Sequence, residues 1–184
     1  MNDKRLVKAA ERIESPRLLF VRPALSDAAE ILSRYASDPE VTRFVAFRRH
    51  ESLKETRDFL SWSDAEWERW PAGPYLVRSR ADNLLLGSTG LSFETPSRAM
   101  TGYVFARDAW GHGYATEALR TMSAAAASAG VKRLYALCHT GHAGSWRVLE
   151  KGGFTREGIL RSYMEFPNLV PGEPADVYCY ALIL

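Results

Sequence analysis

The middle of the chain changes its hydrophobic period twice, and this change constrains the fold more than any other feature. Four short runs that are apolar or alternating predict strands, separated by Asp-Asn, Pro-Ser and Gly breaks: 74–80, 84–94, 99–107 and 133–139. Between the last two, residues 114–130 place apolar side chains at helical spacing and end on Gly130, a residue typical of helix C-termini. This order of strand, helix and strand predicts a sheet that a helix covers.

Two earlier segments predict helices. Residues 25–40 contain Ser26 and Asp27, either of which can cap a helix that Asp38-Pro39 then ends. Residues 51–70 begin with a Ser-x-x-Glu pattern, which has the form of a capping box. Both helices precede the strand-rich middle, so they are expected to pack on the sheet that follows.

Further strands complete the pattern. Residues 17–23, 154–166 and 176–184 predict strands, and 143–153 a short helix that glycines end. Together these elements predict the α/β (α+β) class, with a mixed sheet and helices on both faces. Residues 1–14 are expected to form a loose N-terminal arm, and residues 15–184 a single domain.

Composition excludes several classes of function. The chain has 184 residues and a net charge of +2, which is too small to indicate a nucleic-acid binder. No apolar run approaches the ~20 residues of a membrane span, and the charged first residues lack the apolar core of a secretion signal. We therefore expect a cytoplasmic monomer or homodimer in which Cys138 and Cys179 are free thiols.

Gly111-His112-Gly113 lies between a predicted strand and the long helix. The first N–H groups of a helix have no backbone partners, and glycines allow an anion to approach them without meeting a Cβ. The segment is not a Walker loop, and Thr116 stands where G-x-G-x-x-G needs its third glycine. Taken alone, it is better interpreted as a tight strand-to-helix turn that binds nothing.

A second segment, 141–154, favours an anion-binding site over an empty turn. Together, "WGHGYATEAL" and "GHAGSWRVLEKGGF" resemble the GNAT N-acetyltransferase superfamily and its RimJ/RimL-like (ribosomal-protein N-acetyltransferase) branch. The resemblance covers about Ser15 to Leu184 and implies a mostly antiparallel sheet whose central parallel strands splay apart. It also implies that acetyl-CoA is the cosubstrate. The residues implied to bind it are Val104, Phe105, Ala106, Trp110, Gly111, His112, Gly113, Tyr114, Ala115, Thr116, His142 and Ser145.

The same resemblance implies direct attack of an amine on the thioester in a ternary complex. Backbone groups near Val104 to Ala106 would pair with pantetheine, and an N–H there would polarise the thioester carbonyl. Ser145 would protonate the departing thiolate, although the N-cap of a helix is an equally good interpretation of this residue. Acetyl transfer to a protein N-terminus or a small amine is the predicted activity. An acetyl-CoA sensor with little turnover is the alternative.

Departures from the family keep that alternative open. His142 stands where most members have Asn, and Met100 where relatives often carry Glu, so no general base is obvious. Glu94, at the end of a predicted strand, is the candidate to take the amine proton, and Glu165 has a similar claim. His139 and His142 resemble a metal pair but lack a third ligand nearby, so we expect no metal.

The loop at residues 41–51 is the candidate acceptor wall. It combines basic and aromatic side chains, and the residues expected to contact the acceptor are Arg43, Phe44, Phe47 and Arg48. An ordinary basic surface loop would look the same. Because cations repel one another, the arginines favour a neutral or acidic acceptor with one free primary amine over a polyamine or an aminoglycoside.

Overall fold

The computed structural model describes residues 8–184, which form one eight-stranded mixed sheet in the order β1-β2-β3-β4-β5-β6-β8-β7. Every neighbouring pair is antiparallel except β5 and β6. The strands are β1 (Arg12–Glu14), β2 (Leu18–Val21), β3 (Pro74–Ser79), β4 (Leu85–Thr95), β5 (Arg98–Phe105), β6 (Arg133–His139), β7 (Thr155–Glu165) and β8 (Pro174–Ile183). The predicted class and the central parallel pair are confirmed.

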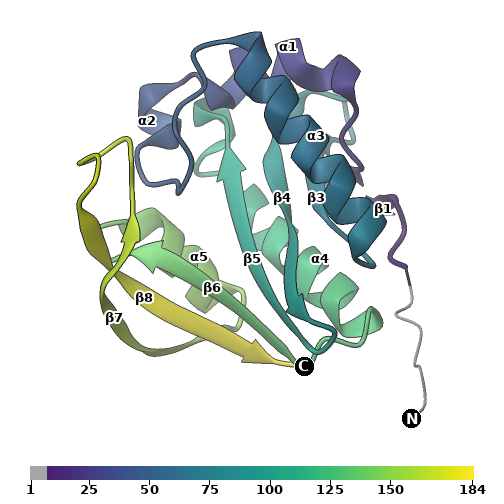
Figure 1. The fold of residues 1–184 in the computed structure, drawn as a ribbon. Coiled ribbons are helices and arrows are strands. Elements are labelled where there is room, and N and C mark those ends of the chain that lie inside the picture. Colours follow the sequence, from purple (N-terminus) through teal and green to yellow (C-terminus); the bar gives the residue numbers. More distant parts are fainter. Residues whose placement is uncertain (1–7) are drawn as a thin grey trace.

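Helices cover both faces of this sheet (Figure 1). They are α1 (Ala28–Ile31), α2 (Pro39–Thr42), α3 (Leu53–Arg69), α4 (Tyr114–Ser128) and α5 (Ala143–Lys151). Strand residues alternate between the faces, so Tyr75 and Val77 pack in the core that α4 contributes to, while Leu76 packs with Ile31 of α1 and Leu60 of α3. Two hydrophobic layers therefore hold the sheet from opposite sides.

The helix predicted at 25–40 is broken into short pieces. A 3₁₀ turn at Leu25–Asp27 precedes α1, and a π turn at Leu32–Ala36 follows it. The Asp27 carboxylate accepts the backbone N–H of Ala24 at 2.8 Å, so neither Ser26 nor Asp27 caps a continuous helix. In contrast, the capping box of Ser52 and Glu55 at the start of α3 is confirmed.

The N-terminal arm is shorter than predicted. Residues 12–14 pair with β2 as β1, with Ile13 opposite Phe20, and the N–H of Ala9 donates to the carbonyl of Pro71 at 2.7 Å. A three-residue polar strand carries too little pattern to be recognised without its partner. Residues 1–7 of the predicted arm lie outside the described residues.

Cys138 and Cys179 are both free thiols. The β6–β8 register places Cys138 opposite Tyr178 and Cys179 opposite Leu137, so the two side chains point to opposite faces of the sheet. Burial raises the pKa of Cys138 to about 11, which keeps this thiol protonated. Within residues 8–184, no helix has the length and apolar character needed to cross a membrane.

Candidate active site

A V-shaped opening forms where β5 and β6 separate. The two strands pair only from Arg98–Met100 to Arg133–Tyr135, and Figure 1 shows them diverging beyond that point. Each keeps its outer partner: β5 stays paired with β4 as far as Phe105, and β6 with β8 as far as His139. The inner backbone edges of both strands therefore face the opening without a strand between them.

Alternation of the peptide groups decides which β5 residues face this opening. The N–H of Ala106 donates to Leu86 of β4 at 2.8 Å, and the carbonyl of Val104 lies against Gly87 of β4. Successive residues of a strand direct their backbone groups to opposite sides, so Tyr103 and Phe105 face the opening. The prediction of backbone pairing by Val104 and Ala106 is therefore corrected: of the three predicted residues, only Phe105 presents its N–H.

The start of α4 lies beyond the end of β5 and is uncapped. Gly113 is the N-cap with φ +78°, its neighbour Gly111 also has φ +78°, and no side chain caps the helix. The N–H groups of Tyr114, Ala115 and Thr116 consequently keep their capacity to bind an anion, and the helix dipole makes this end positive. Positive φ is the physical reason that glycine occupies both positions.

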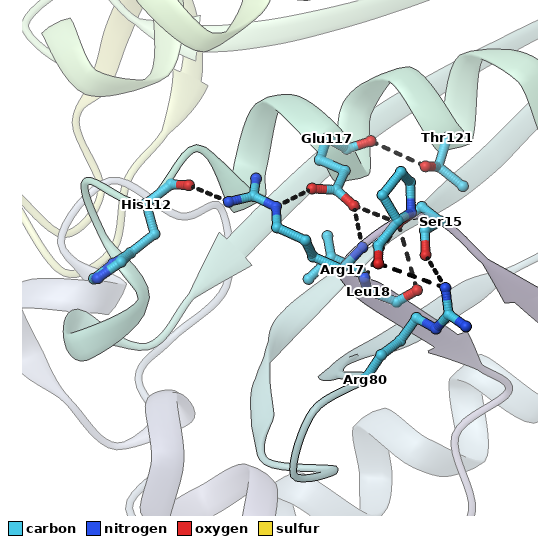
Figure 2. Close-up of polar contacts among 8 residues, drawn as sticks. Ser15, Arg17, Leu18, Arg80, His112, Glu117 and Thr121 are labelled. Carbon is cyan, nitrogen blue, oxygen red and sulfur yellow. Dashed lines mark hydrogen bonds and ion pairs between the residues drawn. The ribbon is translucent and has the colours of Figure 1, made fainter.

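Arg17 holds this glycine loop against the helix, as Figure 2 shows. Its Nη1 donates to the carbonyl oxygen of His112 at 2.9 Å, and its Nε donates to Glu117 at 2.7 Å. Ser15 also donates to Glu117 at 2.7 Å, and the Arg17 guanidinium lies 4.7 Å from the Tyr114 ring centroid. The loop and the first turn of α4 are thereby fixed by one side chain from the start of β2.

Glu117 would otherwise place a negative charge beside the anion site. Burial opposes ionisation, but hydrogen bonds from Ser15 and Arg17 outweigh it and hold the pKa of Glu117 below its usual value. The ionised carboxylate is thus paired with the Arg17 guanidinium. Neither Arg17 nor Glu117 was predicted to belong to the site. An acid in the first turn of an expected phosphate-binding helix was the available signal.

Replacing Glu117 with Gln should lower the free energy of unfolding by about 1–2 kcal/mol at pH 7, because it removes charged hydrogen bonds whose partner Arg17 is 50% exposed. A carboxyl group whose pKa is lower in the folded protein stabilises the fold at pH values above its unfolded pKa, about 4.3. This contribution to the free energy of unfolding is lost as the pH falls through the folded pKa. Urea unfolding at neutral pH and near pH 3.5 measures both effects.

Glu173→Gln in the exposed turn before β8 is the matched control, and it should leave stability unchanged. A Glu117→Gln protein as stable as the wild type, or a deficit that persists unchanged in acid, would contradict the role of this ion pair.

Ser145 and Tyr103 meet across the opening. The Tyr103 hydroxyl donates to the carbonyl of Ser145 at 2.9 Å and lies 3.1 Å from its Oγ. Burial raises the pKa of Tyr103, so the phenol remains a neutral donor. His142, not Ser145, is the N-cap of α5, which corrects the capping interpretation of Ser145. Tyr103 was not singled out from the sequence, because nothing local brings it to α5.

Glu94 lies away from this cluster. It is near the closed end of the V, where it binds Arg98 at 2.5 Å and accepts a hydrogen bond from Tyr135. Those bonds, the one from Tyr135 first, hold its pKa below the usual value. Arg98 and Val104 are six positions apart, about 20 Å along a strand. The prediction of Glu94 as a catalytic base is therefore corrected, and Met100 also lies at this closed end.

The opposite side of the opening has an aromatic wall. The ring of Phe44, in the loop after α2, stacks on His142 with centroids 4.7 Å apart and lies 5.1 Å from His139. Phe166, after β7, meets His139 edge-on at 4.9 Å. The guanidinium of Arg43 lies 5.2 Å from the Phe44 centroid. The structure thus brings Arg43 and Phe44 to the start of α5.

Asn168, in the turn between β7 and β8, fixes the loop that carries this wall. Its amide nitrogen donates to the carbonyls of Thr42 and Phe47 at 2.8 and 2.9 Å, and its oxygen accepts the N–H of Arg49 at 2.9 Å. The Phe47 ring lies beside His50, 5.5 Å away, and Arg48 is exposed on the same loop.

The remaining predicted residues lie at the edges of the site. The indole N–H of Trp110 donates to the Phe105 carbonyl oxygen at 2.8 Å, so this acceptor at the open end of β5 already has a hydrogen-bond partner. The His112 ring is bonded to the Trp110 carbonyl and stacks on Tyr114. Glu165 is exposed at the end of β7. Among residues 8–184, no three His, Cys, Asp or Glu side chains form a group that could hold a metal.

The opening thus combines an unpaired strand edge, an uncapped helix end that can bind an anion and an oriented pair of hydroxyl groups. Residues 17–155 match the Acetyltransferase (GNAT) domain, and the protein belongs to that family. It is accordingly an acyltransferase of the GNAT N-acetyltransferase type.

One relative in sequence and two solved structures are similar to this chain. The chain is 28% identical over 174 residues, 93% of its length and 96% of the relative's, to YoaA of Bacillus subtilis, named an uncharacterised N-acetyltransferase. It shares its fold with RimL, a ribosomal L7/L12 α-N-protein acetyltransferase solved with coenzyme A (TM-score 0.82, 21% identity, 95% and 98% coverage). The microcin C7 self-immunity acetyltransferase MccE, solved with acetyl-CoA and AMP, is similar in fold (TM-score 0.82, 18% identity, 92% and 94% coverage).

Proposed function

We propose that the protein transfers an acetyl group from acetyl-CoA to a primary amine by direct attack in a ternary complex. One observation supports this most strongly: the uncapped start of α4 and the Phe44 wall flank the same opening between β5 and β6. Two reactants that enter from these two sides would meet beside Phe105 and Ser145. Holding both in such a position is itself worth several kcal/mol of the barrier.

The residues divide the chemistry between them. The N–H groups of residues 114–116 would hold the pyrophosphate, and the edge of β5 would pair with the pantetheine arm. The Phe105 N–H would donate to the thioester oxygen as negative charge develops on it, an interaction typically worth ~10²–10³ in rate. Ser145, oriented by Tyr103, would donate a proton to the leaving sulfur.

The acceptor is proposed to be a neutral or acidic molecule with one free primary amine, either a protein N-terminus or a small molecule. Arg43 beside Phe44 supports this, because a cation at the wall repels polyamines and attracts carboxylates, while the aromatic faces suit an apolar side chain. A panel of acidic peptides, aromatic amines, spermidine and kanamycin at fixed acetyl-CoA tests the proposal. Strong turnover of spermidine or kanamycin with none for peptides would overturn the charge argument.

Replacing Ser145 with Ala should lower kcat at least ~10²-fold, the lower range for loss of a general acid, and leave acetyl-CoA binding intact. CoA release with the best acceptor of the panel measures the first effect, and the thermal shift with acetyl-CoA measures the second. Ser61→Ala on the exposed face of α3 is the control, and it should keep full activity.

Two results would count against the proposal. A Ser145→Ala enzyme with the wild-type rate would remove Ser145 from the chemistry. Tight acetyl-CoA binding by the wild type with no CoA release across the panel would favour a sensor that kept the fold and lost turnover.

A further inference from the structure

His142 occupies the junction between the two halves of the proposed site. It is the N-cap of α5 and precedes Ser145, whose hydroxyl meets Tyr103, by three residues. Its ring stacks on Phe44 with an interplanar angle of 16°. One side chain therefore touches the aromatic wall while its backbone begins the helix that carries Ser145. An amine seated against Phe44 would have this imidazole within its reach.

Three acidic side chains around the opening are bound to other partners. Glu94 is held at the closed end by Arg98 and Tyr135. Asp38 caps α2 and binds Arg107 at 2.6 Å, and Asp176 of β8 accepts the N–H of Ser162 at 2.9 Å. These bonds engage all three carboxylates with groups of the protein itself, which leaves them less suited than a free imidazole to take the proton of an attacking amine.

His139, the other imidazole at the wall, is held in a form that cannot accept a proton. Its Nδ1 accepts the backbone N–H of Gly141 at 3.0 Å. The neutral ring must then carry its hydrogen on Nε2, which leaves no free lone pair. His139 is therefore a donor that shapes the wall, and its position beside Phe44 and Phe166 fixes the ring plane.

The surroundings of His142 favour its neutral form. Burial lowers its pKa below the ordinary 6.5, and the neighbouring His139 lowers it further. The positive end of α5 acts in the same direction. The charged groups facing this pair are Arg43 from the loop after α2, which disfavours a cation here, and Asp176 from β8, which favours one at His139. A neutral imidazole keeps one lone pair free to accept a proton, as a general base must.

On these grounds, and resting on the proposed acetyl transfer, we infer that His142 accepts the proton of the attacking amine. The amine nitrogen forms its bond to the thioester carbon and gives a proton to the imidazole, while the carbon–sulfur bond breaks and the sulfur takes a proton from Ser145. One proton moves from nitrogen to sulfur overall. His142 and Ser145 regain their starting states by exchange with water.

The test compares three variants at several pH values with the best acceptor of the amine panel. His142→Asn should lower kcat by about 10²–10⁴ while the thermal shift with acetyl-CoA stays that of the wild type. The wild type should lose activity as the pH falls through the lowered pKa of His142, which lies below the ordinary 6.5, and the variant should lack this acid limb. Ser61→Ala on the exposed face of α3 is the control that should keep both the rate and the pH profile.

A third variant separates proton transfer from a structural role. In His142→Ala, added imidazole should restore part of the rate, and more at pH values where imidazole is a free base. An active wild type with an unaffected His142→Asn enzyme, an acid limb that survives the substitution, or no rescue by imidazole would overturn the role of His142. A wild type that binds acetyl-CoA but releases no CoA would instead overturn the proposed function, and this inference with it.

Discussion

Replacing Gly113 with Asp should abolish acetyl-CoA binding while the protein remains folded. Gly113 has φ +78° and is the N-cap of α4, so an Asp there would direct its carboxylate to the N–H groups that the pyrophosphate needs. Asp is among the few residues that tolerate positive φ, which limits the loss of stability. Acetyl-CoA at ~100 times its Kd should stabilise the wild type by about 2.7 kcal/mol and the variant by nothing measurable.

The chain supplies a matched control for this experiment. Gly172 also has φ +78° and lies in the turn before β8, so Gly172→Asp adds the same charge and the same backbone cost far from α4. It should keep the full thermal shift with acetyl-CoA. A Gly113→Asp protein that responds to acetyl-CoA as the wild type does would show that the anion site lies elsewhere.

The second large effect is expected at Gly87, which has no direct role in chemistry. A Cβ at this position would lie 2.8 Å from Cα of Phe105 and closer still to the carbonyl oxygen of Val104. Because both are backbone atoms, β4 and β5 would have to move apart. Gly87→Ala should lower the free energy of unfolding by about 3 kcal/mol, the upper range for overpacking. It should also weaken acetyl-CoA binding, because the backbone of β5 at Phe105, which faces the opening, would shift.

Urea unfolding and the thermal shift with acetyl-CoA measure these two losses separately. Gly158→Ala on β7, where an added Cβ meets no atom within 4 Å, should change neither. If Gly87→Ala were as stable as the wild type, the close approach of β4 to β5 would not be what positions Phe105.

Features set by neighbours in the sequence were predictable. The capping box of Ser52 and Glu55 satisfies N–H groups three residues away, and Gly130 with φ +89° follows the last turn of α4 as expected. Both depend on local chemistry that any helix of this pattern would need. The order of strands and helices through the middle of the chain follows from the same kind of local signal.

Features that depend on residues distant in the sequence were not predictable. Glu94 has a carboxylate that could act as a base. The pairing of β4 with β5 nevertheless places it near the closed end of the V, which no local pattern reveals. Arg17 and Glu117 are separated by 100 positions, and Tyr103 and Ser145 by 42. A sequence shows which side chains have useful chemistry, whereas the fold decides which of them meet.

The contacts of Asn168 constrain how specificity can change in this family member. The loop after α2 is held by a residue 119 to 126 positions later in the chain, through bonds to three backbone groups. A transplanted loop from another acetyltransferase would arrive without its anchor unless the turn before β8 were exchanged with it. Engineering a new acceptor preference should therefore treat these two segments as one unit, and natural variants that alter one of them are expected to differ in the other.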